Sequence, residues 1–528
     1  MSVNKITDNN LYYKLAICLL ALFVVFFYLG FDEIYYLPPQ STHHWRQSDG
    51  FSMAVNYYQF NLSLFKPEMH HILGGNGRAV GEFPILYYIT GKLFHIFGIS
   101  YSVFRIVHFL PFMLSLLYLA YFLFKKVEIP IFSVLSACIF LFASPLIAYY
   151  SLNFLPNVPS LGFLFAGCIL LCEYLFYETT HKKFSRKLVW ATVMLALATL
   201  LKPTSATAYC AFIFVVFVSL LFPKFAPYIK KEKKIPVLLS CFIIAFLSVI
   251  WFYYAAYYQK VNHTTCFLLD VLPYWKADKD TISFIDYRTK TLWMPVLAHK
   301  YILRIAVLSC LFSLVSSIVK KHYFISVFIL VALILDVLVY LLFYQAFSDH
   351  DYYFINFFGL GLIIFVLSLY YLQSYNIPHK RLSYIKYVLP AFLLFVIMLS
   401  LSQSDKILRE RYAINSPWKN NFNSNLYHPD LRKYVESIGL TPKTKVISIP
   451  DGSPNNTLCL LNLKGITDLY HGYRWANDLG GINEVARENS IKYLVVVSPE
   501  WINREDFKKI KCKELGHFES IYFFELLP

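Results

Sequence analysis

Seven consecutive residues early in the chain, 43–49, gather side chains that are suited to chemistry. They read HHWRQSD, and a second polar element, GEFP at 81–84, follows a glycine-rich stretch. An arginine and two carboxylates so close to apolar segments are costly unless they are paired or used. A carboxylate at a membrane edge can act as a general base that takes a proton from an attacking hydroxyl or amine. Asp49, accompanied by Arg46 and Glu82, is therefore the candidate base.

Asp49 also has a structural interpretation. Residues 49–60 have helical spacing with apolar side chains on one face, which suits a helix lying in the membrane interface. Asp49 then stands at the predicted N-terminus of this helix, where it or Ser48 would accept hydrogen bonds from backbone N–H groups as a cap. Residues 84–97 predict a second interfacial helix.

Histidines next to these carboxylates raise the question of a metal. Two histidine pairs, at 43–44 and 70–71, offer ligands together with Asp49 and Glu82. Adjacent histidines rarely reach one ion, and neither HxH nor HxxxH spacing is present. A divalent ion near Asp49 stays an open alternative.

Apolar runs must position this polar region. The 528 residues are 57% hydrophobic and only 15% charged, against roughly 25% charged in soluble domains. A membrane span needs about 20 apolar residues. Eleven runs approach that length, at 11–30, 101–124, 129–148, 158–178, 187–201, 204–222, 235–257, 301–319, 323–344, 353–373 and 385–402. The fold class predicted is an α-helical polytopic membrane protein with about eleven transmembrane helices, the first retained and not cleaved.

The net charge of +16 encodes topology and does not indicate nucleic-acid binding. Lysine and arginine gather in alternate connections between apolar runs, at 125–126, 182–187, 230–234, 320–321 and 380–386. This is the positive-inside pattern, which places these loops and the N-terminus in the cytoplasm. Residues 31–100, 258–299 and the tail then lie outside. A bacterial inner membrane fits best, because targeting signals and disulfide patterning are absent.

The last part of the chain changes character. Residues 403–528 have a soluble composition, and runs at 445–449, 493–497 and 520–526 read as buried strands, with helical patterns at 429–438 and 481–489. We expect residues 1–402 to form a transmembrane catalytic domain and 403–528 a small α/β domain outside the cytoplasm. Whether Cys459 and Cys512 pair is left open.

Further polar residues border the predicted spans. Lys202 follows a run on the external side, where it either extends toward lipid headgroups or binds the phosphate of a lipid-linked substrate. The loop DHDYY at 349–353 is also external and is typical of an aromatic belt with capping aspartates. Asp336 lies in the middle of an apolar run, far from this face.

In this order, the elements resemble the GT-C superfamily of membrane glycosyltransferases, especially the branch that holds the family 39 protein O-mannosyltransferases and the lipid A aminoarabinose transferases. The resemblance covers the architecture of about the first four hundred residues and is strong over residues 37–105. The motifs that carry it are WRQSD at 45–49, GEFPILYY at 81–88, LFHIFG at 93–98, Phe104-Arg105, Lys202-Pro203 and DYY at 351–353.

The resemblance implies a polyprenyl-phosphate sugar as donor and a glycan, lipid or protein as acceptor. Asp49 would be the base, Glu82 would orient the acceptor or Arg46, and attack opposite the leaving phosphate would invert the anomeric centre. Cations would stabilise charge that develops on the phosphate. The residues implied for this phosphate are Arg46, Lys202 and Arg105, and those implied for substrate are His44, Trp45, Gln47, Asn157, His350, Asp351, Tyr352 and Tyr353.

One residue departs from the family pattern. Where the family often has a second acidic residue, the stretch 153–159 reads NFLPNVP and offers the neutral Asn157. A metal that bridges two acidic loops, or proton transfer through a second carboxylate, is therefore not supported by this stretch.

Three alternatives stay open. A lipid-linked oligosaccharide ligase or polymerase would move a whole glycan and is not separated from a single-sugar transferase by the sequence. A lipid or solute transporter fits the helix count, but no repeated half is visible and the polar residues concentrate on one membrane face. A non-catalytic envelope assembly protein would use the tail as its interaction module.

Overall fold

The computed structural model describes residues 8–178, 185–264, 266–267, 270–375, 384–413, 423–471, 475 and 478–527. Tertiary contacts divide the chain into two compact units. The helical unit comprises residues 1–34, 108–251 and 270–410, and the mixed unit comprises residues 35–107, 252–269 and 411–528.

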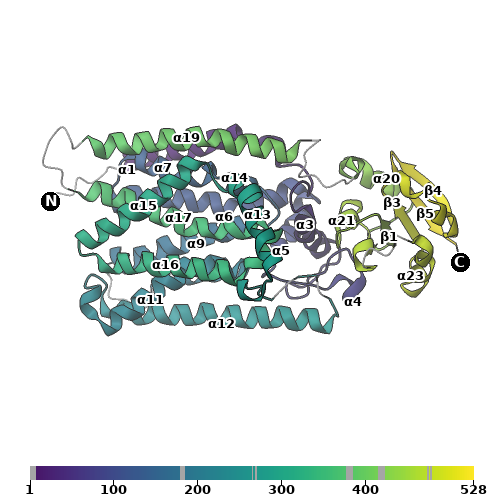
Figure 1. The fold of residues 1–528 in the computed structure, drawn as a ribbon, viewed down its shortest axis with the longest axis horizontal. Coiled ribbons are helices and arrows are strands. Elements are labelled where there is room, and N and C mark those ends of the chain that lie inside the picture. Colours follow the sequence, from purple (N-terminus) through teal and green to yellow (C-terminus); the bar gives the residue numbers. More distant parts are fainter. Residues whose placement is uncertain are drawn as a thin grey trace. The chain divides into compact units, whose positions relative to one another are not determined.

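Long helices are the main elements of the helical unit (Figure 1). Within the described ranges, nine are long and apolar enough to cross a membrane, and a tenth span results if a segment bent by 84° is counted as one. The nine contain α1 (Asp8–Tyr28), α6 (Tyr101–Phe122), α9 (Asn157–Cys172), α11 (Thr207–Leu221), α12 (Lys231–Val261), α15 (Lys300–Val319), α16 (Tyr323–Leu342), α17 (Phe357–Ser374) and α19 (Ile385–Tyr412).

The remaining predicted runs are helical as well. The bent segment joins α7 (Ile131–Ile139) to α8 (Pro145–Ser151), and α10 (Arg186–Leu201) has only 16 residues, fewer than a bilayer span needs. The predicted fold class is confirmed, and the chain is a multi-pass membrane protein. The eleven predicted spans correspond, within the described residues, to nine long helices, one bent segment and one short helix.

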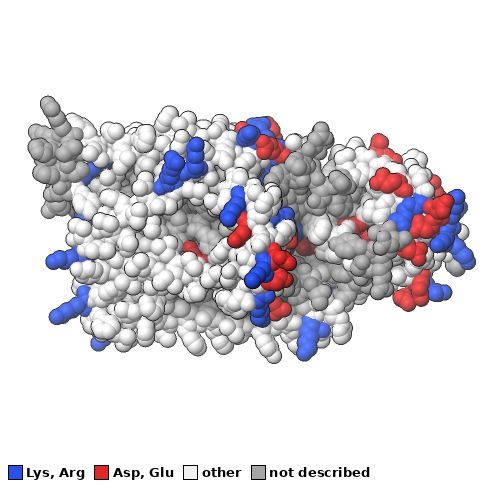
Figure 2. Space-filling model, in the orientation of Figure 1, with Lys and Arg blue, Asp and Glu red and all other residues white. Residues whose placement is uncertain are grey.

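Packing inside the helical unit follows the apolar faces. Helix α9 packs against α10, α11 against α16, and α15 against α17. On the face shown in Figure 2, the long helices present a mostly uncharged surface, whereas acidic and basic side chains are interspersed over the C-terminal sheet. An uncharged exterior is what hydrocarbon requires of helices in a bilayer.

The mixed unit contains a five-stranded sheet in the order β2-β1-β3-β5-β4. Strand β1 is parallel to β2 and β3, and β5 is antiparallel to β3 and β4. The strands are β1 (Lys445–Ile449), β2 (Lys464–Thr467), β3 (Tyr493–Val496), β4 (Cys512–Phe518) and β5 (Ile521–Leu526). The strands predicted at 445–449, 493–497 and 520–526 are present, whereas β2 and β4 were not predicted.

Both faces of the central strands β1 and β3 are buried, which explains their uninterrupted apolar runs. Val446 and Val495 point into a core with α20 (Leu431–Ser437) and α21 (Asn456–Leu461). Ile447 and Leu494 point into a second core with α23 (Ile482–Glu488). The sheet is therefore the middle layer of three. Cys459 and Cys512, whose pairing the sequence left open, are both free thiols.

Short helices complete both units. In the mixed unit, α3 (His44–Gln59) packs against α5 (Ile85–Phe97), and α4 (Leu73–Gly77) lies between them in sequence. Gly91 permits the close approach of α3 and α5, because a Cβ there would stand 2.7 Å from the Cβ of Tyr57. The helical unit adds α2 (Phe31–Ile34), α13 (Lys279–Arg288) and α14 (Met294–Leu297).

Candidate active site

Helix α3 carries the first polar motif, and it begins earlier than the sequence predicted. It starts at His44, after His43 in the left-handed conformation (φ 57°), and no side chain caps it. Asp49 therefore lies in the second turn, because a turn takes 3.6 residues. The prediction that Asp49 or Ser48 caps the N-terminus of the helix is wrong. Residues 47–57 of α3 are all buried, so Asp49 faces the interior of the mixed unit.

Arg46 and Glu82 form an ion pair that links α3 to the start of α5. An Nη of Arg46 donates to a carboxylate oxygen of Glu82, and the Tyr87 hydroxyl donates to the same oxygen at 2.5 Å. Burial acts to raise the pKa of Glu82, but the positive charge of Arg46 and these hydrogen bonds outweigh it and lower the pKa below its ordinary value. Glu82 therefore stays ionised. The Arg46 guanidinium also lies over the Phe267 ring, 4.9 Å from its centroid.

Asp49 is buried with its carboxylate beside this pair. Burial raises its pKa from 3.8 to about 6, although the charge of Arg46 and a hydrogen bond from Asn455 act in the opposite direction. The Nδ2 of Asn455 lies 3.4 Å from the carboxylate oxygen. A carboxylate that titrates this close to neutral pH is better matched to general base catalysis than an ordinary aspartate.

Asn455 and Asn456 belong to the site, and the sequence analysis missed them. The Ser48 hydroxyl donates to Asn456 Oδ1 at 2.5 Å, and the Asn455 amide contacts Asp49. In each pair the two residues are more than four hundred positions apart in the sequence. Asn455 ends the loop that follows strand β1 and Asn456 begins α21, and both side chains are buried. Polar residues after the carboxyl end of a parallel strand often form binding sites. The position of Asn455 and Asn456 after the predicted strand at 445–449 could therefore have indicated them.

The loop after β1 is held in shape by Asp451. Its carboxylate accepts hydrogen bonds from the backbone N–H groups and the hydroxyls of Ser453 and Thr457, at 2.5–2.9 Å. Asp451 is fully used in this way, and its loop presents Asn455 and Asn456 at the start of α21.

Two residues of the first motif, His44 and Gln47, stabilise local structure, whereas Trp45 lies at the surface. The buried His44 ring donates from Nδ1 to the carbonyl of Ser41 at 3.2 Å, and burial lowers its pKa to about 4, so it is neutral. Gln47 donates to the carbonyls of Gln40 and Thr42 at 2.9 and 2.8 Å. Trp45 is partly exposed, with 37% of its surface accessible.

Arg105 is buried at the start of α6, inside the mixed unit. Its guanidinium donates to the carbonyl of Leu37 at 3.0 and 3.1 Å and to that of Pro38 at 3.3 Å. These bonds fix the beginning of the first polar region, and the phosphate-binding role of Arg105 stays a prediction.

The helical unit gathers the other predicted residues, beginning with Lys202. Lys202 follows α10, and its Nζ lies 4.3 Å from the ring centroid of Tyr353 and 5.3 Å from that of Tyr352. Ammonium groups over tyrosine faces are attracted by the ring quadrupole. Lys202 and the loop at 349–353, about 150 residues apart in the sequence, are thus brought together.

The same loop is anchored to α8 and α9. Asn157 donates from Nδ2 to the carbonyl of Tyr352 at 3.0 Å, and the Tyr150 hydroxyl donates to the buried Asp351 carboxylate at 2.6 Å. The His350 ring stacks on Tyr352 with centroids 5.2 Å apart. Asn157 and Asp351 therefore fix the loop that carries the tyrosines. Asp351 lies in a 3-10 turn before α17 and does not cap that helix.

The residues around Asp49 do not fit a metal ion. Glu82 is engaged by Arg46 and Tyr87, and among the described residues no group of three or more His, Cys, Asp or Glu side chains is arranged to hold an ion. The ring of His70 contacts Ser52 and Asn462, and His71 Nε2 lies 3.1 Å from Cys266 Sγ.

Comparison with known proteins places the fold. No family model matches the chain, and no curated protein matches it in sequence. The structure is similar to ArnT from Cupriavidus metallidurans, with a TM-score of 0.58 and 10% identity over 96% of this chain and 98% of that one.

Two further solved structures are similar. The arabinofuranosyltransferase AftD from mycobacteria matches with a TM-score of 0.51 and 12% identity, over 99% of this chain and 40% of that one. The Archaeoglobus fulgidus oligosaccharyltransferase matches with a TM-score of 0.51 and 11% identity, over 92% of this chain and 69% of that one. All three are GT-C glycosyltransferases, so the predicted resemblance is confirmed as a likeness of fold.

Proposed function

We propose that this chain is a membrane glycosyltransferase that moves a sugar from a polyprenyl-phosphate-linked donor to an acceptor outside the cytoplasm. One observation carries the proposal: a buried aspartate, Asp49, whose pKa burial raises to about 6, beside the Arg46–Glu82 ion pair. The fold, shared with an arabinofuranosyltransferase and an oligosaccharyltransferase, supports it. The acceptor would be a glycan, a lipid or a protein.

Asp49 acts as the general base in this proposal. Its ionised carboxylate removes the proton from the acceptor hydroxyl or amine while the acceptor atom forms a bond to the anomeric carbon. The bond from that carbon to the phosphate oxygen breaks, and polyprenyl phosphate leaves with the electron pair. Attack opposite the leaving group inverts the anomeric configuration.

Arg46 and Glu82 have different parts in this reaction. Arg46 supplies positive charge next to Asp49 for the leaving phosphate, where fixed cations stabilise the transition state. Glu82 acts through Arg46, because its carboxylate is engaged by the guanidinium and by Tyr87. Glu82 is therefore proposed as a positioning residue that fixes the direction of Arg46.

Lys202 is proposed as a donor-binding residue on separate grounds. It is a partly buried cation at the end of an apolar helix, held over two tyrosine rings whose loop is fixed by Asn157 and Asp351. An ammonium in such a place can pair with a phosphate at the membrane surface. His44 and Gln47 hold the start of α3 through backbone carbonyls, and His350 stacks on Tyr352. The exposed Trp45 is proposed to contact substrate.

The cellular placement follows from the charge pattern of the loops. We propose a bacterial inner membrane, with the N-terminus in the cytoplasm, residues 1–402 as the membrane domain and residues 403–528 as a periplasmic domain. The basic connections at 125–126 and 320–321 support this orientation.

The test uses the full-length protein in lipid nanodiscs. Synthetic polyprenyl phosphates that carry different labelled sugars are added with membrane extract as acceptor, and labelled product and released polyprenyl phosphate are measured. We expect transfer from at least one donor and its loss in Asp49→Asn. A normally folded Asp49→Asn protein that keeps wild-type transfer would contradict the proposal. So would transport of a soluble solute in proteoliposomes without any binding of polyprenyl phosphate.

A second candidate is transfer of a whole glycan, which the similarity to an oligosaccharyltransferase favours. The same assay separates the two, because a donor that carries an oligosaccharide would then be used in preference to one that carries a single sugar. The product mass gives the answer directly.

A further inference from the structure

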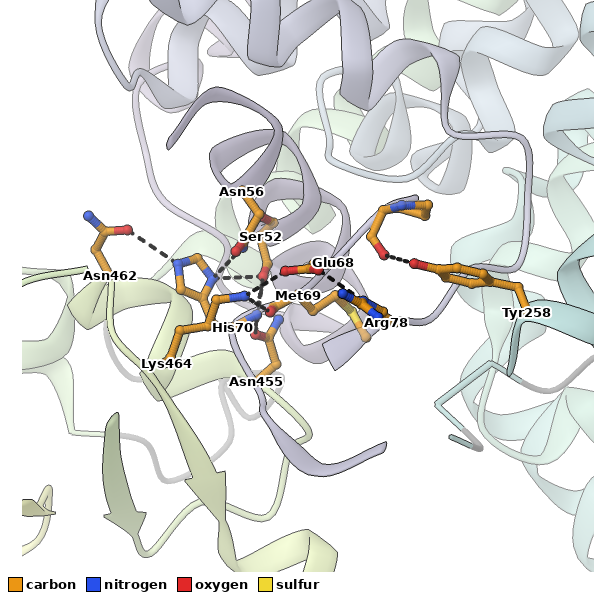
Figure 3. Close-up of polar contacts among 11 residues, drawn as sticks. Ser52, Asn56, Glu68, Met69, His70, Arg78, Tyr258, Asn455, Asn462 and Lys464 are labelled. Atoms are coloured by element: carbon orange, nitrogen blue, oxygen red, sulfur yellow. Dashed lines mark hydrogen bonds and ion pairs between the residues drawn. The ribbon is translucent and has the colours of Figure 1, made fainter. Parts of the chain in front are cut away.

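The side-chain amide of Asn455 has one orientation that its neighbours allow. Its Oδ1 accepts a hydrogen bond from the backbone N–H of His70 at 3.0 Å, and the Ser52 hydroxyl lies 3.2 Å away (Figure 3). A backbone N–H can only donate, so the oxygen of the amide must face it. The NH₂ group is thereby turned toward Asp49, 3.4 Å away.

The partners of Asn455 are themselves fixed. The His70 ring is fully buried, with Nδ1 2.7 Å from the Ser52 hydroxyl and Nε2 3.2 Å from Asn462 Oδ1 (Figure 3). Burial lowers the pKa of His70 well below its ordinary value, so the ring is neutral. A neutral ring that donates from Nε2 to Asn462 accepts at Nδ1 from the Ser52 hydroxyl. The Ser52 oxygen in turn accepts from the backbone N–H of His70 at 2.9 Å.

The backbone around His70 extends the sheet. The N–H of Gly465 in β2 donates to the carbonyl of His70 at 3.0 Å, and the N–H of Ile72 donates to the carbonyl of Gly465 at 2.8 Å. His71 thus forms a parallel bridge with Gly465 at the edge of the sheet. A segment of the first polar region is therefore paired with the C-terminal sheet, which limits the movement of its N–H groups.

Charged groups hold the same segment. The Lys464 ammonium donates to the carbonyl of Met69 at 2.8 Å and lies 3.5 Å from a carboxylate oxygen of Glu68, whose other oxygen accepts from Arg78 at 3.1 Å (Figure 3). Lys464 is almost fully buried. The backbone N–H of His70, which orients the Asn455 amide, is therefore held in place by hydrogen bonds, a strand bridge and an ion pair.

We propose that Asn455, from the C-terminal part of the chain, is a positioning residue that holds the carboxylate of Asp49 for proton removal. The inference rests on the proposed function. A donor hydrogen bond favours the ionised form of a buried carboxylate and restricts its rotation. The other charged or titratable groups that face Asp49 are Arg46, Glu82 and, from α21, Cys459.

The decisive variant is Asn455→Asp. It keeps an oxygen that accepts from the backbone N–H of His70, but it replaces the NH₂ group that faces Asp49 with a second oxygen. Asn455→Ala removes both halves of the amide. Asn483→Ala, in α23, is the matched control because its side chain donates to the backbone carbonyl of Lys509 in an exposed place, away from Asp49. Folding is compared by thermal unfolding of the full-length protein.

We expect kcat to fall about tenfold in Asn455→Ala, the effect of one hydrogen bond, with the donor KM unchanged. We expect the acid limb of the kcat–pH profile near pH 6 in the wild type, because burial raises the pKa of Asp49 to about 6. This limb should move to higher pH in both Asn455 variants, and further in Asn455→Asp. Profiles of the folded Asn455→Asp protein that superimpose on the wild type would overturn the inference. An active Asp49→Asn protein would instead overturn the proposed function, so the two failures are distinguishable.

Discussion

Replacing Asp49 by asparagine should make the protein more stable while it abolishes transfer. The substitution keeps the shape of the side chain and an oxygen that accepts from Asn455, but it removes the negative charge and the base. General base catalysis contributes about 10²- to 10⁴-fold to rates, so kcat should fall by at least about 10²-fold.

The stability change follows from the pKa of Asp49. Burial raises it from 3.8 to about 6, and each unit corresponds to about 1.36 kcal/mol. The folded state binds the proton more tightly than the unfolded chain, so the free energy of unfolding falls as the pH rises from about 4 to 6 and then stays level. At about pH 7.5 the ionised carboxylate therefore costs about 3 kcal/mol, and the Asp49→Asn protein would avoid this cost; at about pH 5 the difference should be about half as large.

The assay combines activity with unfolding monitored by tryptophan fluorescence at about pH 7.5 and about pH 5. Asp430→Asn is the control, because Asp430 is an exposed carboxylate of the C-terminal domain and its substitution should change stability by less than about 0.5 kcal/mol. The reasoning is refuted if Asp49→Asn remains active, or if its unfolding temperature is lower than that of the wild type at the higher pH and the difference does not depend on pH.

Three further predictions concern other parts of the structure. Glu82→Gln should lower the free energy of unfolding by about 1–3 kcal/mol, because the partly buried Arg46 is left without the carboxylate of Glu82. Chemical denaturation should show this difference at neutral pH and its loss at pH values below the depressed pKa of Glu82. Lys202→Gln should raise the donor KM about tenfold with a smaller change in kcat, measured by initial rates, and equal KM values would argue against phosphate binding there. Gly91→Ala should destabilise the packing of α3 and α5 by about 1–3 kcal/mol, whereas Gly361→Ala, which meets no atom within 4 Å, should be neutral in the same thermal assay.

Local patterns predicted much of the architecture. Helices follow apolar runs because each must span hydrocarbon with its backbone hydrogen bonds satisfied, and all eleven predicted runs are helical. Strands β1, β3 and β5 were found because burial on both faces leaves continuous apolar sequence. Strand β2 is only four residues long and contains Lys464 and Gly465, and β4 is interrupted by a bulge near Gly516, so neither carries a clear pattern.

The sequence by itself determined the membrane class, the location of the polar motif and the choice of Asp49, because charge beside apolar runs is visible locally. Only the tertiary structure decided what surrounds Asp49. It moved this residue from the predicted end of α3 into its second turn, and it brought Asn455 to it across 406 positions. Burial and pairing of such distant residues depend on how the sheet and α3 pack within one unit, and no local pattern of residues records that packing.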